Sequence, residues 1–217
     1  MIFSARDEQY IRQRLAALPN TVKLVNFTQE LECQYCSETR QLLNELARLS
    51  DKIKLEVYNF QLDREQVTQY GIDKIPATVI ESDKDYGIRF YGIPAGYEFA
   101  TLLDAIEMVS RGDSGLSTSS LEVLQQLTEP VHIQVFVTPT CPYCPAAVRM
   151  AYQLALASEK IRADGVEVSE FPHLAVHYGV RGVPHTVINE RYAFTGAVPE
   201  ATLLAHLVAA TQTSHRH

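Results

Sequence analysis

Cys33-Gln-Tyr-Cys36 and Cys141-Pro-Tyr-Cys144 contain all four cysteines of this 217-residue chain, and two residues separate the thiols of each pair. In both places a β-branched and aromatic run gives way to a helical pattern, so Cys33 and Cys141 are each predicted to begin a helix. The free N–H groups and positive dipole end of a helix N-terminus stabilise a thiolate, the form of cysteine that attacks disulfides. The first cysteine of each pair is therefore the candidate nucleophile, and Cys36 and Cys144 are the candidate resolving thiols.

The surroundings of the two cysteine pairs repeat at the same spacing. Pro76 follows Cys33 by 43 positions, and Pro184 follows Cys141 by the same distance. Agreement of this kind indicates a tandem duplication. The stretch 110–120 is rich in Ser and Gly and lacks apolar periodicity, so it is the predicted linker. We therefore expect an N-terminal unit, residues 1–115, and a C-terminal unit, residues 116–217.

Both units show the same predicted order of elements. The first has a helix from Ser4 to Leu18, strands over Val22 to Thr28 and Ile53 to Phe60, a short helix from Asp63 to Tyr70, a hairpin of Ala77 to Ile80 and Gly87 to Tyr91, and a helix after Pro94. The second has a helix with a Ser119–Glu122 capping box, strands over Val131 to Thr138 and Val166 to Val168, a hairpin that begins at Thr186, and a helix near Pro199.

This order of elements is that of the thioredoxin fold, an α/β fold with a mixed sheet and helices on both faces. The whole chain resembles the protein disulfide oxidoreductases of thermophilic archaea and bacteria, also called glutaredoxin-like proteins, which consist of two tandem thioredoxin-fold units. The resemblance is carried by Cys33-Gln-Tyr-Cys36, by Gly87-Ile-Arg-Phe-Tyr-Gly-Ile-Pro-Ala-Gly96, by Val135-Phe-Val-Thr-Pro-Thr-Cys-Pro-Tyr-Cys-Pro145 and by Val183-Pro184.

The resemblance implies catalysis of thiol–disulfide exchange on protein substrates, with recycling by a thioredoxin-reductase-type flavoprotein. It also implies that Pro76 and Pro184 are cis and lie against the reactive cysteines. The backbones of Ile75 and Val183, just before these prolines, would then pair with the substrate chain. Because electrons move between cysteines, the reaction requires no bound cofactor.

Tyr35 and Tyr143 occupy the same place in the two cysteine pairs. An aromatic residue at a helix start can simply cover the core. A residue between two accessible cysteines cannot be deeply buried, however, so we expect both rings to be partly exposed and to contact substrate.

Zinc is the alternative chemistry for two C-x-x-C pairs. The chain between Cys36 and Cys141 far exceeds the ~15 to 20 residues usual in a four-cysteine zinc ribbon. Each pair also begins a helix inside its own complete domain pattern, so the sequence favours redox chemistry and no metal site.

Composition narrows the function further. The net charge is −7 and no basic stretch is present, which argues against a nucleic-acid partner. No apolar run reaches the ~18 residues that a membrane span needs, and the N-terminus lacks a signal-peptide core. We therefore expect a cytoplasmic protein with no membrane partner.

The two sites differ in nearby charge. Neither predicted strand before a cysteine pair contains Asp or Glu, so the sequence does not identify the proton acceptor for the resolving cysteines. Glu30, Glu32 and Glu38 surround the first site, whereas no carboxylate occurs between Glu129 and Glu159. Cys141 is therefore predicted to be more acidic than Cys33.

Two other functions fit the pattern. One is a redox relay that passes electrons from a flavoprotein reductase to a dedicated partner such as a peroxidase. Relays built from paired thioredoxin folds often retain one dithiol, so two intact pairs favour the broader catalyst. The other is a chaperone-like module that binds proteins in an apolar groove without turnover.

Overall fold

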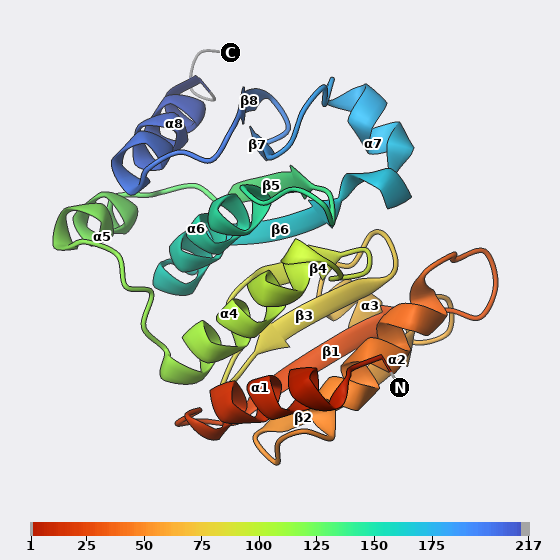
Figure 1. Cartoon of the computed structure of the whole chain (residues 1–217). Helices are drawn as coiled ribbons and strands as arrows, with labels where there is room; N and C mark the ends of the chain where they lie inside the picture. The colour runs from red at the N-terminus through yellow and green to blue at the C-terminus, as the bar shows by residue number, and fades with distance from the viewer. Residues whose placement is uncertain (1, 214–217) are drawn as a thin grey trace.

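The computed structural model describes residues 2–213, which form two units of the same element order (Figure 1). The first unit comprises α1 Ala5–Ala16, β1 Val22–Thr28, α2 Cys36–Ala47, β2 Ile53–Asn59, α3 Arg64–Gln69, β3 Ala77–Glu81, β4 Ile88–Tyr91 and α4 Tyr97–Arg111. The second comprises α5 Thr118–Gln125, β5 Val131–Val137, α6 Cys144–Ala157, β6 Ile161–Glu167, the 3₁₀ turn η1 Val168–Glu170, α7 Pro172–His177, β7 His185–Ile188, β8 Tyr192–Thr195 and α8 Glu200–Thr213. The predicted tandem arrangement of two thioredoxin-like units is confirmed.

The strands of both units join in one mixed eight-stranded sheet of order β2-β1-β3-β4-β6-β5-β7-β8. The junction is a parallel pairing of β4 with β6, in register from Ile88 opposite Ala163 to Tyr91 opposite Val166. The sequence predicts a mixed sheet in each unit but not that the two sheets merge. The predicted boundary between residues 115 and 116 falls in the segment between α4 and α5 and stays a proposal.

The sheet separates two hydrophobic clusters. The larger one joins the sheet to α1, α2, α4, α6 and α8, and it includes the buried Cys141 and Cys144. The smaller one lies where α3 and α7 pack, around Phe27, Tyr91 and Phe136. Figure 1 shows α4 and α6 side by side over the middle of the sheet, where the two units meet. The cysteine pairs are therefore built on the face with the larger core.

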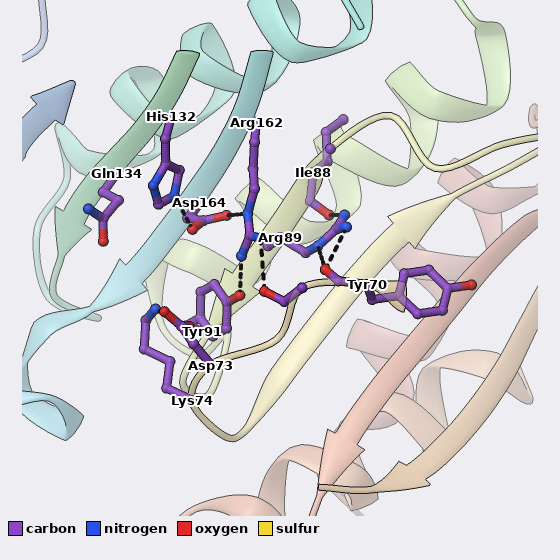
Figure 2. A network of polar contacts seen from close by, with 12 residues as sticks. Tyr70, Asp73, Lys74, Ile88, Arg89, Tyr91, His132, Gln134, Arg162 and Asp164 are labelled. Atoms are coloured by element: carbon purple, nitrogen blue, oxygen red, sulfur yellow. Dashed lines mark hydrogen bonds and ion pairs between the residues drawn. The ribbon is translucent and has the colours of Figure 1, made fainter. Parts of the chain in front are cut away.

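Strand β6 corrects the sequence prediction, which placed a strand only at Val166 to Val168. Arg162 and Asp164 interrupt the apolar pattern, but both belong to β6 and join a polar network at the junction (Figure 2). Arg162 donates from Nη1 to the carbonyl oxygen of Gly71 at 2.8 Å and from Nη2 to the hydroxyl of Tyr91 at 2.5 Å. Arg162 thus contacts the first unit, and Asp164 pairs with His132 and Arg162 of its own unit, so hydrophobic periodicity alone does not identify this strand.

The start of α5 is a second correction. The predicted capping box of Ser119 and Glu122 is wrong, because Ser117 is the N-cap and its hydroxyl accepts the N–H of Ser120 at 3.3 Å. Ser117 also donates its hydroxyl to Glu200 of α8 at 2.7 Å. This tertiary contact fixes which serine of the run caps the helix.

Candidate active sites

The two cysteine pairs straddle helix N-termini, and the predicted helix starts at Cys33 and Cys141 are wrong by about one turn. Helix α2 begins at Cys36 and α6 at Cys144, each after a tyrosine N-cap. In the second pair the N–H of Cys144 points at the sulfur of Cys141 with an N···Sγ distance of 3.2 Å. The nucleophile candidate thus lies beyond the helix end, where free N–H groups and the dipole favour a thiolate.

Both pairs are present as disulfides, and the Cα atoms of each pair lie 5.5 Å apart. Cys36 and Cys144 are almost wholly buried, at 1% and 0% exposure, and Cys141 is 7% exposed. Cys33 is half-buried. The more accessible sulfur of each pair is therefore the one that the sequence identifies as the nucleophile.

The two sites lie on the same edge of the sheet. Strand β1 precedes the first pair and β5 the second, and the pairings through β3, β4 and β6 make β1 and β5 parallel. Four strand spacings separate them, which is about 19 Å in the sheet direction. The two disulfides are therefore too far apart to exchange directly, although one extended polypeptide can reach both.

The predicted cis bonds are confirmed at both Ile75-Pro76 and Val183-Pro184. In the second unit the carbonyl oxygen of Val183 lies 3.8 Å from the sulfur of Cys141, which places the proline segment against the reactive sulfur. The role predicted for Val183, to present backbone to a substrate, stays a proposal.

The tyrosines within the cysteine pairs are accessible, as predicted. Tyr143 is 71% exposed and Tyr35 is half-buried. Their expected contact with substrate stays a proposal.

The three carboxylates predicted around the first site are exposed, and one of them has a basic neighbour. Glu30 and Glu38 are exposed, and Glu30 lies 3.4 Å from the guanidinium of Arg40. Glu32, directly before Cys33, is exposed and has a left-handed φ of 57°. The predicted negative surroundings of Cys33 are thus present, with one of the three carboxylates partly compensated.

Glu98 is a candidate that sequence reasoning missed. It lies in the first turn of α4, has no exposed surface, and neither of its carboxylate oxygens has a hydrogen-bond partner among the described residues. Burial raises the pKa of Glu98 to about 7. Burial and the Glu98 charge also raise the pKa of Tyr152 on α6, the helix that begins at Cys144 and packs against α4.

A signal for Glu98 was available in the sequence. It precedes Leu102, Ala105 and Val109 at helical spacing, on the buried face of α4. A carboxylate at a position of the apolar stripe indicates a special role, because burial of a charge is energetically costly.

No cluster of three or more His, Cys, Asp or Glu side chains within residues 2–213 is arranged to hold a metal ion. None of the helices in the same range combines the length and apolar character needed to cross a membrane.

Comparison with known sequence families gives one assignment for both units. A family described as thioredoxin domain matches residues 22–104 and again residues 131–209. These ranges contain both cysteine pairs and both cis prolines.

Solved structures similar to the whole chain include a protein disulfide oxidoreductase from Aeropyrum pernix K1, at 30% identity and a TM-score of 0.91, covering 97% of this chain and 94% of that one. They also include the NTD_N/C domain of the alkylhydroperoxide reductase AhpF from Enterococcus faecalis, at 27% identity and a TM-score of 0.87, covering 94% and 99%.

A curated relative is the F component of alkyl hydroperoxide reductase from Staphylococcus epidermidis, which is 29% identical over 126 residues, or 58% of this chain. The match covers 22% of that relative, so this chain corresponds to a small part of the longer protein.

Proposed function

Because this chain belongs to the thioredoxin domain family, we propose that it catalyses thiol–disulfide exchange on protein substrates through two dithiol sites. The observation that carries the proposal is the repeated geometry: each unit has a C-x-x-C disulfide at a helix N-terminus and a cis X-Pro bond before a central strand. The cytoplasm, where a dithiol pair stays reactive, is the proposed compartment.

In the reducing direction, the thiolate of Cys33 or Cys141 attacks a substrate disulfide and releases one substrate sulfur as a thiolate. The resolving Cys36 or Cys144 then loses its proton and attacks the sulfur of the nucleophile within the mixed disulfide. The second substrate sulfur leaves as a thiolate. Two electrons have moved to the substrate, and the C-x-x-C pair is left as a disulfide. The reverse sequence forms a substrate disulfide.

Glu98 is the proposed proton acceptor for Cys144. Glu98 lies in the first turn of α4, which packs against α6, and its pKa of about 7 lets it take and return a proton near neutral pH. The second site would thus use a residue of the first unit, so the strand before Cys141 needs no acidic side chain.

Substrate chain is proposed to lie along the sheet edge that carries both cysteine pairs. The backbones of Ile75 and Val183 would pair with it, next to cis prolines Pro76 and Pro184. The exposed Tyr143 and half-buried Tyr35 would contact its side chains. Such apolar contacts do not depend on one particular substrate sequence, so they suit a catalyst that acts on many proteins.

A redox relay is the second candidate, favoured by the likeness to the F component of alkyl hydroperoxide reductase. Here a flavoprotein would reduce one cysteine pair, and a dedicated thiol partner would receive the electrons. Substrate breadth separates the two functions. Dithiothreitol-driven reduction of insulin, an unrelated protein, supports the general catalyst, and reduction confined to one partner supports the relay.

A further inference from the structure

The segment Gly92–Tyr97, here called the junction segment, connects β4 to α4 and runs between the two active sites. At one end, the N–H of Gly92 donates to the carbonyl oxygen of Pro76, the cis proline of the first unit, at 2.8 Å. At the other end, the N–H of Tyr97 donates to the carbonyl oxygen of Pro139 at 2.9 Å. Pro139 lies two residues before the nucleophile candidate of the second unit, so first-unit backbone contacts the second site directly.

Close packing accompanies this contact. Gly96 has a φ of +61°, and a Cβ added there would lie 2.3 Å from the carbonyl oxygen of Pro139 and 3.0 Å from its Cβ. Such distances require Pro139 to move, because the nearest atom is backbone rather than the end of a flexible side chain. Gly96 therefore allows the start of α4 to reach the second active-site loop.

Comparison with the second unit shows that the fold does not require close contacts at the glycine that follows the last strand of a unit. Gly196 follows β8 as Gly92 follows β4, and its N–H donates to the carbonyl oxygen of cis Pro184 at 2.8 Å. Both glycines have positive φ, +103° and +96°. A Cβ on Gly196 would meet nothing within 4 Å, whereas one on Gly92 would lie 2.5 Å from Oε2 of Glu170 in the second unit. The crowding belongs to the contact between units.

Glu170 holds the middle of the junction segment. Its Oε2 accepts the N–H of Ile93 at 2.7 Å. The segment is thus fixed to the second unit at two points, η1 and the Pro139 loop.

We propose that the junction segment is a positioning element of the second active site, so that the reactivity of Cys141 depends on backbone supplied by the first unit. The N–H of Cys141 donates to the carbonyl oxygen of Thr138 at 3.2 Å, closing the turn that contains Pro139. This turn sets the sulfur of Cys141 opposite the N–H of Cys144. Displacement of Pro139 moves that sulfur and weakens the hydrogen bond that stabilises its thiolate. The inference rests on the proposed thiol–disulfide exchange.

The test measures iodoacetamide alkylation of Cys33 and Cys141 against pH in one full-length Cys36→Ser/Cys144→Ser background, with peptide mapping to separate the two rates. Gly96→Ala should raise the midpoint for Cys141 by about one pH unit and lower its rate at neutral pH about tenfold. The rate at Cys33 should stay within about twofold, which also reports that the first unit is folded. Gly112→Ala is the matched control, because Gly112 has a φ of +66° and no atom within 4 Å of an added Cβ.

A second pair of variants disrupts the hydrogen bond. Tyr97 is the first residue of α4, a position that accepts proline. Tyr97→Pro removes the N–H and puts the proline Cδ in its place, against the carbonyl oxygen of Pro139, whereas Tyr97→Ala keeps the N–H. Both lose the ring. Alkylation of Cys141 should be about fivefold slower in Tyr97→Pro than in Tyr97→Ala. Equal rates in this pair, or an unchanged midpoint in folded Gly96→Ala, would overturn the inference.

These outcomes are separable from failure of the proposed function. If the wild type does not reduce insulin, general catalysis of thiol–disulfide exchange on protein substrates is wrong whatever the alkylation profile. If the wild type reduces insulin and the variants leave Cys141 unchanged, only the role of the junction segment is wrong.

Discussion

Nε2 of His132 lies 2.6 Å from Oδ2 of Asp164, a carboxylate with no exposed surface at the junction of the two units (Figure 2). Burial disfavours the charged imidazole, but the hydrogen bond to Asp164 and the charges of Asp164 and Glu190 together outweigh it, so the net pKa of His132 is raised. Burial likewise opposes ionisation of Asp164, yet the contacts with His132 and Arg162 lower its pKa. The fold therefore stabilises the charged forms of both partners.

This pair predicts a pH-dependent stability. Because the pKa of His132 is raised, its contribution is complete below the ordinary histidine value of about 6.5 and is lost as pH rises through the folded-state pKa. The lowered pKa of Asp164 gives a contribution present above about 3.9 and lost as pH falls through its folded-state pKa. Stability from the pair is thus greatest in mildly acidic solution.

His132→Gln keeps a donor for Asp164 but cannot titrate. Urea denaturation should show roughly 1–3 kcal/mol less unfolding free energy in this variant at pH 6. The difference should shrink as pH rises past the folded-state pKa of His132. A difference that stays constant from pH 6 to pH 9 would mean that the histidine charge does not contribute.

Thiolate acidity should differ between the two nucleophiles. Glu32 lies directly before Cys33, and a charge ~6 Å away in solvated surroundings disfavours a thiolate by about 0.7 kcal/mol, or about half a pH unit. Cys141 has no such neighbour in sequence and accepts an N–H from Cys144. Alkylation of each nucleophile, with its resolving cysteine changed to Ser, should therefore give a lower midpoint for Cys141. A Cys33 midpoint equal to or below that of Cys141 contradicts this order.

Glu98→Gln should slow the second site selectively. The amide has nearly the same shape but cannot accept the proton of Cys144, and loss of a positioned base costs about a hundredfold. Stopped-flow decay of a mixed disulfide at Cys141 should show this loss near neutral pH and less of it at alkaline pH. Decay at Cys33 in the same variant serves as the internal control. Equal slowing at both cysteines would show a general structural effect instead.

Local features of the sequence predicted most of this architecture. Two thioredoxin-like units were identified from the cysteine pairs, the X-Pro bonds and the hydrophobic periods. Each of these features depends on residues that are close together in the sequence. The merged sheet depends on pairing β4 with β6 across the duplication, which no local pattern encodes. Strand β6 was largely missed for the same reason, since Arg162 and Asp164 make their contacts at the inter-unit junction.

At the active sites, too, nearby sequence predicted some features, and those that depend on contacts between the units were missed. The position of each cysteine pair before a helical pattern predicted Cys33 and Cys141 as nucleophiles, which stays a proposal. The resemblance to protein disulfide oxidoreductases implied both cis bonds, which the structure confirms. Glu98 was not predicted because it lies in α4 of the first unit and not in the strand before a cysteine pair. The structure brings this residue to α6 from the other unit, so its relation to Cys144 appears only in three dimensions.

Each dithiol should work without the other, because the two sites are about 19 Å apart by strand spacing. A Cys33→Ser/Cys36→Ser variant should retain dithiothreitol-dependent insulin reduction by the second site. The reciprocal Cys141→Ser/Cys144→Ser variant should retain it by the first. If either folded variant is inactive, the two dithiols act in series, as in a relay.

Reactivation of scrambled ribonuclease in a glutathione buffer tests catalysis on protein substrates most directly. The substrate is unrelated to any dedicated partner, and its isomerisation requires attack by a nucleophilic cysteine and release of the mixed disulfide. We expect multiple turnovers by the wild-type chain, partial activity in each double-serine variant and none when all four cysteines are serine. Reactivation by the wild type no faster than by the four-serine variant would contradict catalysis on protein substrates.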